Sequence, residues 1–225
     1  MNSISRPTLW LVSGGLGLVI FGVSLQFWLG KGPRSDSPPE AAIPAGMPGD
    51  GGKLLPVISR LESFTLTNHH GQLVNLESLR GKVWVADVIF TRCAGPCLQM
   101  TQRMKELVEA TQREGKVEFV SFTTDPEFDT PEVLRKYAER TGAEKPHWRF
   151  FTGTKAELVR VMVGGLKLTA LEKKPEERSD PADLFIHSTL FVIVDGQGRL
   201  RKAVEGLEPD FKAKVMDAVG RLSRE

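Results

Sequence analysis

The feature that most constrains the fold is an apolar run at residues 83–90, which reads V-W-V-A-D-V-I-F. A strand that alternates apolar and polar side chains buries one face, whereas a continuously apolar strand is typical of burial on both faces. Such a strand needs a covering layer on each side, and helices packed on both faces of a central sheet supply it. The run therefore predicts an α/β protein with a central sheet and flanking helices.

Strand-like and helix-like segments alternate along the rest of the chain, which supports the same architecture. Strands are expected at 64–67, 117–122, 149–151, 188–195 and 200–204. Helices are expected after the cysteines at 93 and 97, from Pro131 to Gly142, after Thr154 and from Pro209. Pro131 suits a first helical turn, and Thr154 with Glu157 has the spacing of a capping box. The charged segment 172–183 is expected to be an excursion between elements.

The amino-terminal segment has a different composition. Residues 7–30 contain no charged side chain, and 24 residues at about 1.5 Å each can cross a hydrocarbon core of roughly 30 Å. Trp10 and Trp28 would then lie near the two membrane interfaces. We expect residues 1–30 to be a transmembrane anchor; the alternative, a cleaved signal peptide, usually has a shorter apolar region.

A Pro- and Gly-rich segment at 31–56 follows and is typical of a flexible tether. The folded domain is therefore expected at 57–225. The whole chain has 30 basic and 28 acidic residues, so its charge balance does not predict nucleic-acid binding. Basic residues flank the apolar segment on both sides, so charge alone does not determine its orientation in a membrane.

The chain contains two cysteines, Cys93 and Cys97, directly after the apolar run. On a helix, this spacing places both on one face with Cα atoms about 6 Å apart. A disulfide reaches at most about 6.8 Å between Cα atoms, so a metal ion between the two sulfurs fits as well as a bridge. Ligand sites of α/β sheets also favour the end of a strand where a helix begins.

A helix amino terminus favours thiolate over thiol, but the dipole contributes only about 0.3–1 kcal/mol, less than one pKa unit. We expect Arg92 and a bound cation to supply the remainder. Met100 and Met104 lie on the apolar face of the expected helix, so they are interpreted as core residues and not as thioether ligands.

Of the four histidines, only His187 is positioned to join the cysteines. His69 and His70 fall in an expected hairpin turn and are interpreted as solvated loop residues, and His147 is interpreted as structural. His187 directly precedes the strand at 188–195, at an edge from which its side chain could reach the cysteines. Two thiolates and one imidazole form a soft donor set, which suits copper better than magnesium or calcium.

Five segments in a fixed order match the pattern of one known family. They read F-T-L-T-N-H-H-G-Q-L-V, G-K-V-W-V-A-D-V-I-F-T-R-C-A-G-P-C, V-S-F-T-T-D-P-E-F-D-T-P-E-V-L-R-K-Y, W-R-F-F-T-G and H-S-T-L-F-V-I-V-D-G-Q-G. From Leu61 to Leu222 the chain resembles the Sco/SenC family of membrane-anchored, thioredoxin-like copper proteins that serve cytochrome c oxidase assembly.

The resemblance implies a thioredoxin-like domain in which Cys93, Cys97 and His187 bind one copper ion, as Cu(I) or Cu(II). It implies a cytoplasmic amino terminus and a domain in the periplasm or an equivalent compartment. Family members deliver copper to the binuclear site of cytochrome c oxidase subunit II or keep its cysteines reduced. Asp125 matches an acidic family position close to the metal region; from the residues alone, it is equally a turn-forming residue before Pro126.

The chain departs from the usual C-P-x-x-C-P motif, because Ala94 and Leu98 follow the two cysteines. An acidic residue often precedes the family histidine, and here that residue is Ile186. The alternative function is a thiol-disulfide oxidoreductase that uses Cys93 and Cys97, although thioredoxins have two residues between their cysteines instead of three. A receptor domain with permanently bridged thiols is a further alternative. We expect a metallochaperone rather than an enzyme.

Overall fold

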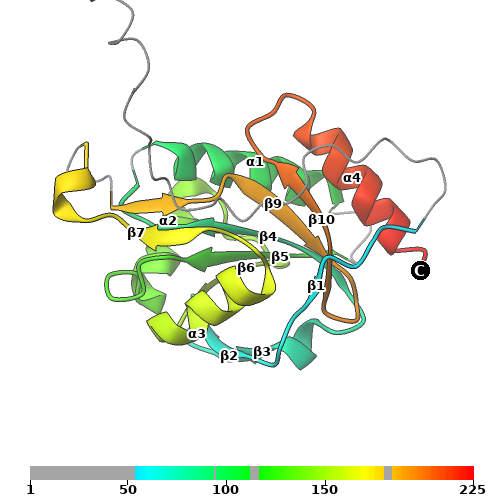
Figure 1. Ribbon diagram of the computed structural model, residues 1–225, viewed down its shortest axis with the longest axis horizontal. Coiled ribbons are helices and arrows are strands. Elements are labelled where there is room, and N and C mark those ends of the chain that lie inside the picture. The colour runs from blue at the N-terminus through cyan, green and yellow to red at the C-terminus, as the bar shows by residue number, and fades with distance from the viewer. Residues whose placement is uncertain (1–53, 94, 112–116, 180–183) are drawn as a thin grey trace, which may run out of the picture. The chain divides into compact units, whose positions relative to one another are not determined.

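A computed structural model describes residues 54–93, 95–111, 117–179 and 184–225 (Figure 1). The expected anchor at 1–30 lies outside the described residues, as does the expected tether except for residues 54–56. Among the described ranges, no helix is both long enough and apolar enough to cross a bilayer.

The main sheet has eight strands in the order β1-β10-β9-β4-β5-β6-β2-β3. Its strands are β1 Ser59–Arg60, β2 Thr65–Asn68, β3 Leu73–Asn75, β4 Val83–Ile89, β5 Val117–Thr123, β6 Trp148–Thr152, β9 Leu190–Val194 and β10 Arg199–Glu205. The helices are α1 Pro96–Thr111, α2 Pro131–Thr141, α3 Lys155–Val159 and α4 Phe211–Leu222, with the 3-10 turns η1 Leu76–Leu79 and η3 Pro175–Glu177 and a π-helical segment, η2 Arg160–Gly165, directly after α3. A separate two-stranded sheet pairs β7 Ala170–Glu172 with β8 Phe185–His187.

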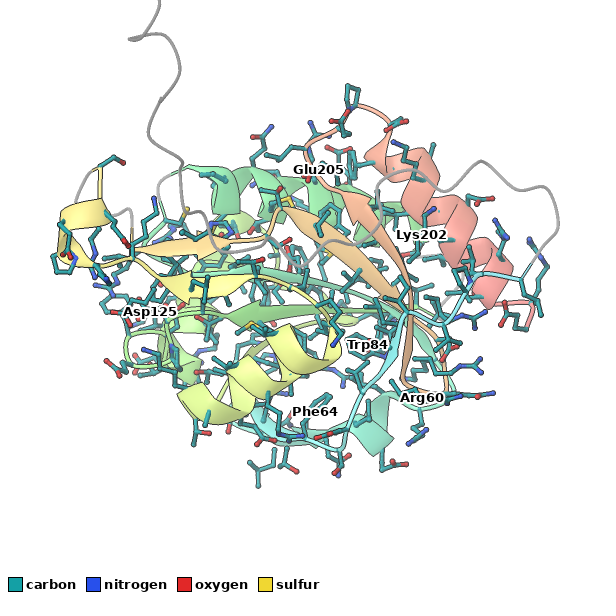
Figure 2. All side chains as sticks on the ribbon, viewed as in Figure 1. Arg60, Phe64, Trp84, Asp125, Lys202 and Glu205 are labelled. Carbon is teal, nitrogen blue, oxygen red and sulfur yellow. The ribbon has the colours of Figure 1, made fainter. Side chains whose placement is uncertain are left out.

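Strand β4 confirms the prediction made from the apolar run. All seven of its residues are buried, and it pairs with β5 in parallel and with β9 antiparallel. Alternate β4 side chains enter two different cores. Val85 and Ile89 pack with α1, α2 and α4, whereas Trp84 and Val88 pack with α3 and η2 on the other face. Figure 1 shows α1 and α4 on one side of the sheet and α3 on the other, and Figure 2 labels Trp84 in the middle.

The helix signals in the sequence act mostly as expected. The Thr130 side chain accepts the Val133 N–H and caps α2, and Gly142 ends that helix with a positive φ of 68°. The Thr154 hydroxyl accepts the Glu157 N–H at 3.2 Å. The Glu157 carboxylate instead binds Arg160 and accepts the Thr65 N–H. Among the described bonds it does not accept the Thr154 N–H, which would be the second bond of the predicted capping box.

The segment around the charged excursion differs from the prediction. β7 and β8 pair antiparallel, with Ala170 opposite His187, so His187 lies at the end of a strand instead of at a loop edge. The next strand begins at Leu190, two residues later than expected. Each strand of the β7–β8 ribbon has only three residues, which is too short for alternation to be visible in the sequence.

Candidate metal centre

The structure brings together the three predicted donor residues from three separate elements. Cys93 lies in the turn after β4, where its N–H donates to the Phe90 carbonyl at 3.2 Å. Cys97 is buried in the first turn of α1, and His187 ends β8. The two sulfurs and one imidazole nitrogen all lie within 4.8 Å of one another, and both cysteines are free. The predicted convergence of these side chains is therefore confirmed.

The hydrogen bonds of His187 orient its ring towards the sulfurs. Its Nδ1 lies 3.3 Å from the Ser188 carbonyl, which can only accept, so Nδ1 carries the hydrogen. Nε2 then has a free lone pair, and it lies 3.4 Å from Cys97 Sγ. The Phe90 ring contacts the imidazole edge-on, at 5.6 Å between ring centroids. A histidine that donates one ring N–H to a carbonyl has the arrangement typical of metal ligands.

The two thiols ionise unequally. A hydrogen bond from Cys97 lowers the pKa of Cys93 to about 4, and His187 and nearby backbone N–H groups act in the same direction against burial. The same bond raises the pKa of Cys97, and burial raises it further. At neutral pH the metal-free pair is therefore one thiolate and one thiol. A bound cation would displace the Cys97 proton.

Asp87 is a buried acid within the apolar run at 83–90, and it was not predicted to be a site residue. It follows Val85 on the face of β4 that packs against α1, and it is fully buried. Neither of its carboxylate oxygens has a hydrogen-bond partner among the described residues. Burial raises the pKa of Asp87 to about 7, and the nearby Ser121 hydroxyl and His187 offset only part of this effect. A charged residue within an apolar run was the signal available in the sequence.

Arg92 and Asp125 lie beside the cysteine turn and bind each other. Nε and Nη2 of Arg92 donate to Asp125 Oδ2 at 3.0 and 2.5 Å, and the guanidinium lies 4.4 Å from the centre of the Phe128 ring. Asp125 also forms a turn, because its carbonyl accepts the N–H groups of Phe128 and Asp129. Figure 2 labels Asp125 at the end of the sheet away from Lys202. Neither residue belongs to the described group of converging donor atoms.

Residues His69, His70 and Glu144 form a second cluster, and here one prediction is wrong. His70 is exposed as expected, but His69 is only 2% exposed instead of solvated. The His69 Nδ1 accepts the Phe150 N–H at 3.2 Å, so Nε2 carries the hydrogen, and it lies 3.3 Å from the Glu144 carboxylate. Burial lowers the pKa of His69 and favours this neutral form. Unlike His187, His69 presents no free lone pair to the cluster.

The two methionines of α1 are core residues, as predicted. Met100 and Met104 are both fully buried and belong to the core that α1 shares with α2 and α4.

Comparison with known proteins identifies the family. The SCO1/SenC family profile matches residues 58–221. The SCO1 protein homolog of Bacillus subtilis is 37% identical over 155 residues, which are 68% of this chain and 77% of that protein. The structure of BsSco, a member of the Sco family of cytochrome c oxidase assembly proteins with a disulfide switch, is 32% identical; the match covers 76% of this chain and 98% of that one, with a TM-score of 0.64.

The copper-bound structure of Bradyrhizobium japonicum ScoI has the same fold at 24% identity. That match covers 72% of this chain and 97% of the other, with a TM-score of 0.59. The profile match spans most of the domain that the sequence predicts, and the described strands and helices form the thioredoxin-like α/β fold of these structures. The chain therefore belongs to the SCO1/SenC family.

Proposed function

We propose that Cys93, Cys97 and His187 bind one copper ion, and that the protein delivers it to the binuclear copper site of cytochrome c oxidase subunit II. The observation that carries the proposal is the convergence of the three donor atoms within 4.8 Å of one another. The tautomer of His187 supports it, because the lone pair of Nε2 faces the cysteine sulfurs. In this proposal the protein is a metallochaperone, and copper is its cargo.

Copper fits the donor set better than other common ions do. Thiolate and imidazole ligands favour soft ions, and a structural zinc site usually has four protein ligands. Three donors suit Cu(I) and leave room for an added ligand on Cu(II). Relatives with this fold, such as ScoI of B. japonicum, have been crystallised with copper bound.

Transfer would proceed by ligand exchange with thiolates of the partner. Cys97 must lose its proton to bind the ion, and it regains one when the ion leaves. Because hydrogen bonding to Cys93 and burial hold the pKa of Cys97 high, this proton uptake favours release. The partner's thiolate would first replace the Cys97 sulfur. Cys93 would release the ion last and would remain as a thiolate.

For the amino-terminal part of the chain, the proposal rests on the sequence. Residues 1–30 would anchor the protein by a single span with a cytoplasmic amino terminus, and residues 31–56 would tether the domain at 57–225. The domain would then work in the periplasm or an equivalent extracytoplasmic compartment. The uncharged run of 24 residues at 7–30 supports the span, and the resemblance to the Sco/SenC family supports the orientation.

The unequal thiols favour one second candidate, a thiol-disulfide oxidoreductase. The Cys93 thiolate would attack a disulfide of the partner and release one partner thiolate. Cys97, after losing its proton, would attack the mixed disulfide, which leaves the partner reduced and the Cys93–Cys97 pair oxidised. The lowered pKa of Cys93 supports this role, because the thiolate is the attacking species.

Copper titration of the reduced full-length protein and of its His187→Ala variant tests these functions. We expect one copper per wild-type chain, with sulfur ligands in its X-ray absorption spectrum. Loss of a ligand should weaken binding by more than the roughly 10- to 100-fold typical of an outer partner. His70→Ala, which removes an exposed histidine, should bind as the wild type does.

A reductase would give a different pattern. His187→Ala would then keep most of its disulfide-reducing activity, and copper binding by the wild type would be weak or would not depend on position 187. That pattern would refute copper delivery in favour of the second candidate.

A further inference from the structure

The turn that carries Cys93 has few buried residues, although the Cys93 side chain packs against the core beneath α1. Among its described residues, Thr91 and Cys93 are half-buried, and Arg92, Gly95 and Pro96 are exposed. Cys97, by contrast, is fully buried in α1. A segment with so few buried apolar contacts needs hydrogen bonds to stay in one conformation.

Those hydrogen bonds come from Asp129, a fully buried residue that directly precedes the cap of α2. Its Oδ1 accepts the Thr91 hydroxyl at 2.5 Å, and its Oδ2 accepts the Thr91 N–H at 3.2 Å. Oδ2 also accepts the Thr123 hydroxyl, whose oxygen accepts the Asp125 N–H in turn. One carboxylate therefore joins the cysteine turn to the end of β5 and to the loop that follows it.

Arg92 adds a second connection to the same loop. Its guanidinium binds the Asp125 carboxylate and lies over the Phe128 ring. The Asp125 carbonyl accepts the Asp129 N–H at 2.8 Å, so the two acids are parts of one turn. The two residues that precede Cys93 are thus each bound by an acid of the loop at 124–129.

We propose that Asp129 is a positioning residue for the metal centre, which holds the Cys93 sulfur where it can share one ion with Cys97 and His187. The proposal rests on the proposed copper function, since it assigns a role within that site. Outer groups that orient metal ligands contribute to affinity because the site then needs no rearrangement on binding. Asp129 does so through Thr91, two residues from the ligand and without contact to the ion.

The test is the Cu(I) dissociation constant of the reduced full-length protein, measured by competition with a Cu(I)-specific chelator. Asp129→Asn replaces one carboxylate oxygen with an NH₂ group, which cannot accept the hydrogen bonds that Thr91 and Thr123 now donate. We therefore expect the affinity for Cu(I) to fall about 10- to 100-fold. Thr91→Val, which removes one of the three bonds, should weaken binding by a smaller factor. Thr91→Ser keeps the hydroxyl and should restore wild-type affinity.

Asp195→Asn is the matched control. Asp195 is also a buried acid that accepts several hydrogen bonds, but it lies in the β9–β10 turn and binds Arg199 and Arg201. The Asp195→Asn variant should be less stable than the wild type but should bind copper equally well, because the hydrogen bonds of the cysteine turn are unchanged. Folded Asp129→Asn protein with wild-type affinity would overturn the proposal. If that variant does not fold, Thr91→Val with unchanged affinity would overturn it equally.

Amide hydrogen exchange of the metal-free protein separates this proposal from the copper function. In Asp129→Asn, peptides covering 90–97 should exchange about tenfold faster, while those covering 190–205 should not change. If the wild type binds no copper, the copper function fails, and unchanged exchange at 90–97 would still refute the positioning by Asp129.

Discussion

At the residue scale, the partner of a single ring nitrogen decides what a histidine can do. The Nδ1 of His187 faces a carbonyl, which leaves Nε2 free for an ion. The Nδ1 of His69 faces a backbone N–H, which places the hydrogen on Nε2 instead. Both residues have a neighbouring donor cluster, so residue type and proximity alone do not separate them. The hydrogen-bond partner of Nδ1 distinguishes the two histidines.

Asp87 predicts a pH dependence of stability at the same scale. Its pKa is raised from 3.8 to about 7 by burial, so the native state keeps a proton that the unfolded state releases in this window. The free energy of unfolding therefore falls as the pH rises from about 4 to about 7. Above pH 7 it stays lower by the full amount. At about 1.4 kcal/mol per pH unit, the loss amounts to about 4 kcal/mol.

Asp87→Asn should remove this contribution, because an amide does not ionise. Relative to the wild type, the variant should gain up to about 4 kcal/mol in unfolding free energy between pH 4 and pH 8. Urea unfolding of both proteins at several pH values measures the difference. Parallel stability curves across this range would contradict the assignment of a raised pKa to Asp87.

At the scale of elements, the β7–β8 ribbon is a small structure that carries a ligand. Two strands of three residues are marginal by themselves in water, so packing must hold them. Phe185 contacts Phe90 edge-on, at 5.1 Å between ring centroids, on the same side as His187. Ile186 lies between Phe185 and His187, is 46% exposed, and points to the other face. The contact of Phe185 with Phe90 therefore helps to hold the ribbon that carries His187.

Phe185→Ala should release the ribbon while leaving the main sheet folded. We expect weaker Cu(I) binding, by about tenfold or more, because the imidazole loses its fixed position. Ile186→Ala changes the neighbouring residue on the opposite face and should bind copper as the wild type does. Equal affinities for the two variants would show that the ribbon does not depend on the contact between the rings. Chelator competition together with hydrogen exchange at 185–187 gives the measurement.

At the scale of the whole molecule, Arg201 joins parts of the chain that are far apart in sequence. Its side chain is 3% exposed, and it donates to the Leu55 carbonyl, to Asp195 and to Glu225. Leu55 falls within the segment expected to be a tether, yet its side chain is buried in the core that α1, α2 and α4 share, and Glu225 follows α4. A buried charge is tolerated when each of its donors is paired, and here the partners come from three distant segments, namely Leu55, the β9–β10 turn and Glu225.

Arg201→Met should destabilise the domain more than its loss of packing would explain. It leaves the Leu55 carbonyl and Glu225 without this donor, and breaking a buried ion pair costs about 3–5 kcal/mol. Since 1 kcal/mol shifts the Tm of a domain of this size by about 2–4 °C, we expect a fall of roughly 6–20 °C. Lys136→Ala removes an exposed pair with Glu132 and should leave the Tm unchanged. A similar Tm for both variants would contradict the role of Arg201.

The sequence by itself determined the local features of this protein. The apolar run at 83–90 predicted the doubly covered strand β4, and Pro131 and Gly142 predicted the ends of α2. These signals depend on neighbours within a few residues, so they can be read without a fold. The family pattern also identified Cys93, Cys97 and His187 as a group; their convergence is confirmed, and their copper binding stays a prediction.

Only the tertiary structure decided the contacts between distant segments. The β7–β8 ribbon, the burial of His69 and the bonds from Asp129 to Thr91, 38 positions apart, could not be predicted. Hydrogen-bond partners and burial depend on which segments become neighbours in space, and no spacing along the chain encodes that. The donors of the metal centre could therefore be named from the sequence, whereas the groups that orient them required the fold.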